Sequence, residues 1–166
     1  RPEKPLPSGL ISLKNAKNGI IFMMGVSLLS MVIAAYVAST TTNGIIEWWP
    51  SIIIWFLAVF LLINYESSSK YSLNLKNRGL PGNIAISASV AMVVILGAAG
   101  VFQLTNIRVI SVAIIGFLYN LSREIVKDVQ DMEGDEGRNT LAMKIGPEKT
   151  RIIAYVISLI TLISII

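Results

Sequence analysis

The sequence predicts an all-α fold, a multi-pass bundle of transmembrane helices, and two observations lead to that prediction. Of the 166 residues, 54% are hydrophobic and only 14% are charged, and the mean hydropathy is +0.68. Soluble domains carry about 25% charged residues, so this chain is short of the charge that a surface in water needs. Its apolar residues also form blocks of about 20, the length of helix that crosses about 30 Å of hydrocarbon.

Five apolar segments are expected to form membrane helices, so about five membrane helices are predicted. Residues that favour turns, namely Gly, Pro, Asn and Ser, interrupt the sequence between them. The five segments are residues 17–39, 45–64, 83–102, 107–126 and 151–166.

Each segment has a feature that bears on its assignment. The first contains no charge beyond its first residue, and the second carries three tryptophans, which commonly anchor helices at the membrane interface. The third is rich in Gly, Ala and Ser, which allow helices to pack closely. The fourth runs directly into a strongly charged stretch, and the fifth has no polar flank at its end.

The charged residues fall almost entirely on one side of the predicted bundle. If the segments alternate in direction, the N-terminus, residues 65–82 and residues 123–151 share that side. It then carries all but one of the 14 Lys and Arg residues and all but one of the 10 acidic residues. Because Lys and Arg are enriched in cytoplasmic loops, we expect this face to be cytoplasmic. The bias concerns basic residues, so the acids on the same face indicate a polar chamber there.

The residue types in the chain limit its chemistry. It contains no Cys and no His, which excludes disulfides, thiolate zinc sites, imidazole ligands and a Ser-His-Asp triad within it. Carboxylates, cations, hydroxyls and amides remain, and this set favours a hard cation such as Mg²⁺ if a metal is present. The net charge of +4 has an ordinary topological cause in a membrane protein, so we expect no nucleic-acid partner.

The charged stretch "SREIVKDVQDMEGDEGR" follows the fourth apolar segment directly. If the helix continues past Ser122 at about 100° per residue, four carboxylates share one face and two basic residues flank them. The acidic residues are Glu124, Asp128, Asp131 and Asp135, and the basic ones are Arg123 and Lys127. Such a face suits Mg²⁺ that holds a phosphorylated ligand, with the bases taking the remaining phosphate charge. The alternative is a solvated loop whose acids pair with local bases, and the spacing alone leaves both open.

Two stretches of the chain resemble motifs of one protein family. "SREIVKDVQDMEGDEGRNTLAMKIG" resembles the second aspartate-rich motif of the UbiA superfamily of intramembrane prenyltransferases, and "RPEKPLPSGLIS" resembles the segment that follows the first such motif. They occur in the family's order with membrane helices between them, so the resemblance covers essentially the whole chain. Within the superfamily, the chain is most similar to archaeal members that make ether lipids, although aromatic prenyltransferases share much of the pattern.

The resemblance implies roles for nine residues. Three aspartates would be catalytic and would hold Mg²⁺ as the cofactor, four basic residues would bind the diphosphate, and a Tyr/Lys pair would belong to a lid. In that order, these residues are Asp128, Asp131 and Asp135; Arg1, Lys4, Arg123 and Lys127; and Tyr71 and Lys76. In "YSLNLK" the lysine follows the tyrosine by five positions, whereas the family motif usually has four.

The resemblance also bears on the extent of the domain. The family has nine membrane helices, and its first aspartate-rich motif should precede Arg1. Residues 1–166 are therefore expected to form a single transmembrane prenyltransferase domain that is incomplete at its N-terminus and at its C-terminus.

The function that the resemblance implies is Mg²⁺-dependent transfer of a geranylgeranyl group from its diphosphate to the hydroxyl of a glycerol-phosphate lipid precursor, in archaeal ether-lipid synthesis. The partners would be an isoprenyl diphosphate, this acceptor and membrane lipids, at a cell-membrane site that faces the cytoplasm.

One alternative is prenylation of an aromatic acceptor such as 4-hydroxybenzoate. A membrane transporter and a structural membrane protein are the two non-enzymatic candidates, but intramembrane charge marks transport paths, and here the acids gather at one face.

Overall fold

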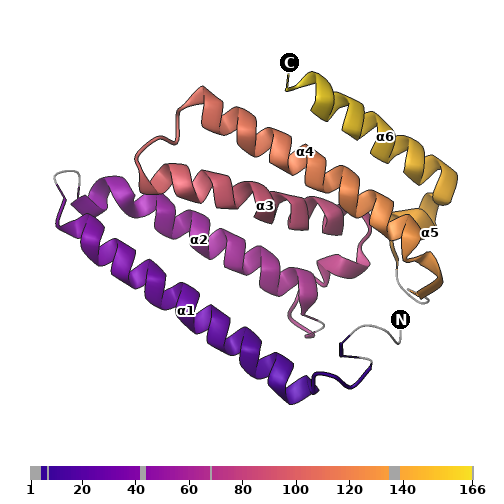
Figure 1. The fold of residues 1–166 in the computed structure, drawn as a ribbon, viewed down its shortest axis with the longest axis horizontal. Helices are drawn as coiled ribbons and strands as arrows, with labels where there is room; N and C mark the ends of the chain where they lie inside the picture. Colours follow the sequence, from indigo (N-terminus) through magenta and orange to yellow (C-terminus); the bar gives the residue numbers. More distant parts are fainter. Residues whose placement is uncertain (1–4, 7, 42–43, 68, 135–138, 166) are drawn as a thin grey trace. The chain divides into compact units, whose positions relative to one another are not determined.

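The computed structural model describes residues 5–6, 8–41, 44–67, 69–134 and 139–165, and this part of the chain is helical with no strand (Figure 1). Six α-helices and two short 3₁₀ helices follow one another. Their bounds are α1 Leu13–Ser39, α2 Gly44–Glu66, η1 Leu75–Asn77, α3 Leu80–Gly100, α4 Ile107–Gln130, η2 Met132–Gly134, α5 Leu141–Ile145 and α6 Pro147–Ile163. The predicted all-α fold is confirmed.

Four helices in the described part, α1 to α4, are long and apolar enough to cross a membrane. The fifth predicted segment forms α6, which begins at Pro147 and has 17 residues. The prediction of about five membrane helices therefore compares with four such helices in the described part, and α6 differs from them by its charged first turn.

The contacts divide the chain into two compact units, Arg1–Ile52 and Ile53–Ile166. The first contains α1, whose N-terminus is capped by the hydroxyl of Ser12, which accepts a hydrogen bond from the amide of Asn15. It also contains the start of α2, where Trp48 is buried and Trp49 is exposed. The prediction of a single domain stays a prediction.

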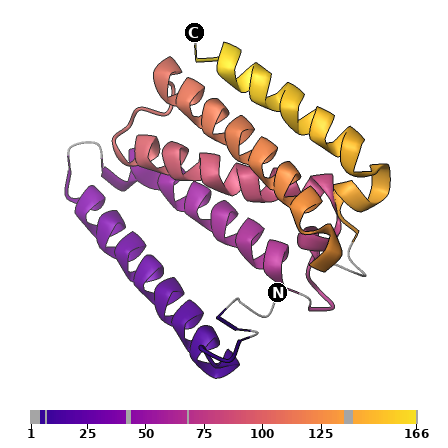
Figure 2. The ribbon, with the colours of Figure 1, turned by 45° about the vertical axis from the view of Figure 1, so that its right-hand side comes forward.

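In the second unit, α4 lies between α3 and α6 and runs antiparallel to both (Figures 1 and 2). Small buried residues of α3, among them Ala91 and Ala98, allow close packing of the helices. On the other side of α4, the hydroxyl of Ser122 donates to the carbonyl of Ala154 at 2.8 Å and lies 2.6 Å from the hydroxyl of Ser158. Hydrogen bonds of this kind hold α4 to α6 in surroundings where unpaired polar groups are costly.

Two glycines dock the loop that contains η1. Gly82 lies in the first turn of α3, and a Cβ atom there would collide with the carbonyl oxygen of Leu75. Gly79 has a φ of +67°, and a Cβ atom there would lie 3.1 Å from the carbonyl oxygen of Asn139. The loop therefore lies against both α3 and the segment that precedes α5, because both positions lack a side chain.

Candidate active site at the end of α4

The charged stretch is less helical than the sequence analysis expected. Helix α4 ends at Gln130, and Asp131 is its C-cap, with its amide donating to the carbonyl of Lys127 at 2.9 Å. The 3₁₀ helix η2 follows, so the helix that was assumed to continue past Ser122 ends before Asp131, and Asp135 lies outside the described residues. A carboxylate at a helix C-terminus opposes the helix dipole, which is consistent with the stop at Asp131.

The carboxylate of Asp128 is half-buried and bonded to α3. Its Oδ2 atom accepts a hydrogen bond of 2.9 Å from the side-chain amide of Asn83, which is only 6% exposed. The carbonyl of Asn83 accepts from the hydroxyl of Ser87 at 2.6 Å, and that hydroxyl accepts from the side-chain amide of Asn120 at 3.3 Å. A line of hydrogen-bonded polar groups therefore joins α3 and α4 and includes Asp128.

Glu124 lies one turn before Asp128 and is also buried. Its two oxygens accept from the guanidinium of Arg123 at 3.0 Å and from the ammonium of Lys127 at 3.1 Å. The side chains of Arg123 and Lys127 are 61% and 49% exposed, so both also face out of the bundle. One carboxylate against two cations leaves a net positive charge, which suits a phosphate group.

The loop with the predicted Tyr/Lys pair is tied to α2 by a buried asparagine. The Oδ1 atom of Asn64 accepts from the amide of Leu73 at 3.0 Å, and its side-chain amide donates to the carbonyl of Phe60 at 2.9 Å. The hydroxyl of Ser72 donates to the carbonyl of Asn64 at 3.3 Å. These bonds fix the chain just before η1 begins.

The structure treats the two members of that pair differently. Lys76 lies in η1, and a Cβ atom on Gly82 would be 3.5 Å from its Cα atom, so its backbone packs beside the residue that precedes Asn83. The side chain of Tyr71 is 93% exposed, so the bundle does not hold it. Lys76 therefore belongs to the same end of the bundle as Asp128, while the role of Tyr71 stays a prediction.

The metal assignment can be compared with the donors that are present. Among the described residues, no group of three or more carboxylates is placed to hold a metal ion. The predicted ligand Asp135 and the predicted diphosphate ligands Arg1 and Lys4 lie outside the described residues. Asp128 and Asp131 supply hard carboxylate oxygens, and Mg²⁺ is usually bound by one or two carboxylates together with phosphate oxygens and waters. The donor set thus fits Mg²⁺.

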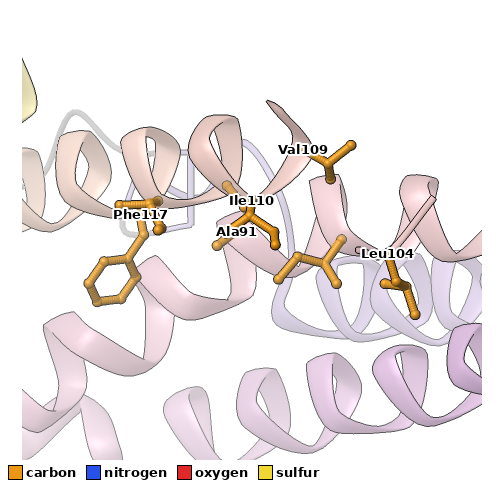
Figure 3. A pocket seen from close by; sticks show the side chains of 8 residues that line it. Ala91, Leu104, Val109, Ile110 and Phe117 are labelled. Atoms are coloured by element: carbon orange, nitrogen blue, oxygen red, sulfur yellow. The ribbon is translucent and has the colours of Figure 1, made fainter. Parts of the chain in front are cut away.

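An apolar cavity of about 260 Å³ lies farther along the interface of α3 and α4 (Figure 3). It is lined by Ala91, Ile95, Leu104, Val109, Ile110, Ala113, Ile114 and Phe117. Phe117 precedes Asp128 by 11 positions on α4, which corresponds to about 16 Å along the helix. The α3–α4 interface therefore changes from polar at Asp128 to apolar at the cavity.

The sequence analysis did not single out two residues that shape this site. It did not name Asn83 or Asn64, both of which are buried polar residues at the ends of apolar segments. A polar side chain in a membrane helix costs free energy unless it is paired, so an asparagine in an apolar segment predicts a hydrogen-bond partner on another element. The pairing of Glu124 with Arg123 and Lys127 is the local pairing of acids with bases that the alternative for this stretch included, although it occurs on a helix and not in a loop.

The fold and this site define a class, a multi-pass helical membrane protein with carboxylates, an amide and cations gathered at one end of a helix pair. The whole chain, residues 1–166, matches the family model described as the UbiA prenyltransferase family. The chain belongs to this family, which confirms the resemblance.

Curated relatives are identical to this chain at about a third of the aligned positions. Digeranylgeranylglyceryl phosphate synthase of Korarchaeum cryptofilum is 34% identical over 98% of this chain and 52% of its own length. Proteins of the same name from Pyrococcus furiosus and Sulfolobus acidocaldarius are 35% and 33% identical, over 99% and 95% of this chain and 52% and 50% of their own lengths. The chain thus spans about half the length of these relatives. No solved structure matches it.

Proposed function

We propose that this chain is part of an enzyme that transfers a geranylgeranyl group from its diphosphate to the hydroxyl of a glycerol-phosphate lipid precursor. The observation that carries the proposal is the identity of 30–35% over nearly the whole chain to proteins named digeranylgeranylglyceryl phosphate synthase. The polar end of the α3–α4 interface and the cavity beyond it support the proposal, because the substrate has a charged head and an apolar tail.

The charged head would lie at the end of α4. Asp128 and Asp131 would hold Mg²⁺ there, with Asp135, and when bound the ion would neutralise charge on the departing diphosphate. Arg123 and Lys127 carry one more positive charge than Glu124 cancels, so they would bind diphosphate oxygens. Lys76 would approach the same group from η1, and Arg1 and Lys4 are further candidates from the sequence.

The apolar tail would extend along α3 and α4 into the cavity. The apolar walls would exclude water from the reacting carbon, which favours attack by the acceptor hydroxyl over hydrolysis. The bond between that carbon and the diphosphate would break as the new ether bond forms, and the hydroxyl would lose its proton. The concentration of Lys and Arg residues on one side of the predicted bundle supports a site that opens to the cytoplasm.

The test is an acceptor competition with the intact protein in lipid nanodiscs. Geranylgeranyl diphosphate is supplied with geranylgeranylglyceryl phosphate or with 4-hydroxybenzoate, with and without Mg²⁺. We expect transfer to the glyceryl phosphate only, and only with Mg²⁺. Transfer only to the aromatic acceptor would show that the protein belongs to the quinone branch. Flux of a substrate across the membrane with no transfer to either acceptor would favour a transporter.

A further inference from the structure

We infer that Asn83 is a positioning residue, which orients the carboxylate of Asp128 for the divalent cation of the proposed function. The contact that carries the inference is the hydrogen bond of 2.9 Å from the side-chain amide of Asn83 to Oδ2 of Asp128. It joins residues 45 positions apart, on two different helices. The fold therefore creates this pair.

Asn83 is itself held firmly enough to position a partner. Its backbone amide donates to the carbonyl of Gly79 at 3.2 Å, and its carbonyl accepts from the hydroxyl of Ser87 at 2.6 Å. The residue is 6% exposed, and the neighbouring Gly82 is packed against the backbone of Leu75. These bonds fix the backbone at Asn83, and its burial limits the rotamers that its side chain can adopt.

The chemistry of the pair suits an ionised Asp128. A hydrogen bond from an amide to a carboxylate is shorter and about twice as strong as one between neutral groups. The amide is neutral, so this bond adds no positive charge beside Asp128, unlike the two cations that bind Glu124. In metal sites, partners that orient the ligands are important enough that removing one commonly costs about 10–100-fold in metal affinity.

The competing explanation is that Asn83 only joins α3 to α4. Ser122 allows the two roles to be separated, because it is buried on α4 and its hydroxyl bonds to Ala154 and Ser158 of α6. Ser122→Ala removes those bonds between two helices but changes no hydrogen bond of Asn83. It is the matched control for a loss of packing.

The experiment measures Mn²⁺ binding by electron paramagnetic resonance, with inorganic diphosphate present and without any prenyl substrate. The intact protein in nanodiscs is compared with Asn83→Leu, Asn83→Ser and Ser122→Ala, and thermal unfolding without metal reports on packing. We expect Asn83→Leu to weaken Mn²⁺ binding about 10–100-fold. Asn83→Ser keeps a donor on a shorter side chain and should lose less, and Ser122→Ala should change only the unfolding temperature.

Two outcomes would overturn the inference. One is unchanged Mn²⁺ affinity in both Asn83 variants, and the other is a loss in Ser122→Ala as large as that in Asn83→Leu. Asn83→Ser keeps the test decisive if Asn83→Leu does not fold.

The proposed function is judged separately, because lack of prenyl transfer in a protein that shows the expected Mn²⁺ pattern contradicts the function alone. Normal transfer with unchanged Mn²⁺ affinity in the Asn83 variants contradicts the positioning role alone, and a protein that binds no Mn²⁺ contradicts both.

Discussion

Glu124 and Asp128 lie one turn apart on α4, and each has a different kind of partner. Glu124 is buried between Arg123 and Lys127, so its charge is already cancelled by two cations. Asp128 accepts a hydrogen bond from the neutral side-chain amide of Asn83, and this bond adds no positive charge beside the carboxylate. Both oxygens of Glu124 are already bound to cations, so a divalent cation could bind them only by displacing those cations. At the scale of single residues, the structure therefore disfavours Glu124 as a metal ligand.

The metal assignment predicts a large effect of small substitutions. Asp128→Ala and Asp131→Ala should each lower Mg²⁺-dependent turnover about 100-fold or more, because transition-state charge on the diphosphate loses its stabilisation. The measurement is the initial rate of prenyl transfer, with the amount of protein in the membrane fraction as the check on insertion. Glu47→Ala is the control, since Glu47 is exposed and lies at the start of α2. Near-normal rates in both aspartate variants would contradict the assignment.

At the scale of elements, the site depends on how closely η1 approaches α3. Asn64 ties the loop to α2, and Gly79 and Gly82 remove the side chains that would hold it away from its neighbours. This close approach brings the backbone of Lys76 beside the turn that carries Asn83. The loop is therefore positioned by contacts that lie outside the predicted motifs.

A methyl group at position 82 should displace this loop. Gly82→Ala should lower the free energy of unfolding by about 1–3 kcal/mol, because its Cβ atom meets backbone that cannot rotate away. Gly97→Ala is the matched control on the same helix, where nothing lies within 4 Å of the added atom. It should be neutral or stabilising by up to about 1 kcal/mol, since alanine favours helix more than glycine does. Thermal or denaturant unfolding in detergent compares the two, and equal stability would refute the close approach.

The cavity between α3 and α4 predicts which prenyl chains are accepted. Ala113 is buried and lines the cavity, so a phenylalanine at this position should fill it. Ala113→Phe should therefore reduce use of geranylgeranyl diphosphate at least about 10-fold relative to the shorter geranyl diphosphate, because excess volume in a packed site is poorly tolerated. Val112→Phe is the control, because Val112 is the neighbouring residue and is 54% exposed. The ratio of kcat/KM for the two donors is the measurement. An unchanged ratio in Ala113→Phe would mean that the tail lies elsewhere.

At the scale of the whole molecule, the charge distribution makes a prediction about sidedness. The chain has no Cys, so single cysteines can be introduced one at a time. Ser69 lies in the loop after α2 and Gln103 lies between α3 and α4, and both are exposed. In intact cells, a membrane-impermeant maleimide should label Gln103→Cys, whereas Ser69→Cys should react only after the membrane is opened. The unsubstituted protein is the control, and the reverse pattern would invert the orientation.

How far the sequence could predict the site depended on the range of the interactions. The motif identified Asp128, Asp131, Arg123 and Lys127 because these residues are close together along the chain. It could not place the end of α4, because helix ends depend on a balance of local effects, and Asp131 proved to be the C-cap. It could not pair Asp128 with Asn83, because that contact depends on how α3 and α4 are aligned.

The sequence by itself determined that this protein is helical, that it crosses a membrane several times, and which family it belongs to. Hydrophobicity and motif residues are local properties, so they can be read directly along the chain. Only the tertiary structure decided that Asn83 meets Asp128, that Glu124 holds Arg123 and Lys127, and that the apolar cavity begins about 16 Å from Asp128 along α4. The physical reason is that packing brings distant residues together, and a buried polar group must then find its partner wherever the helices place one.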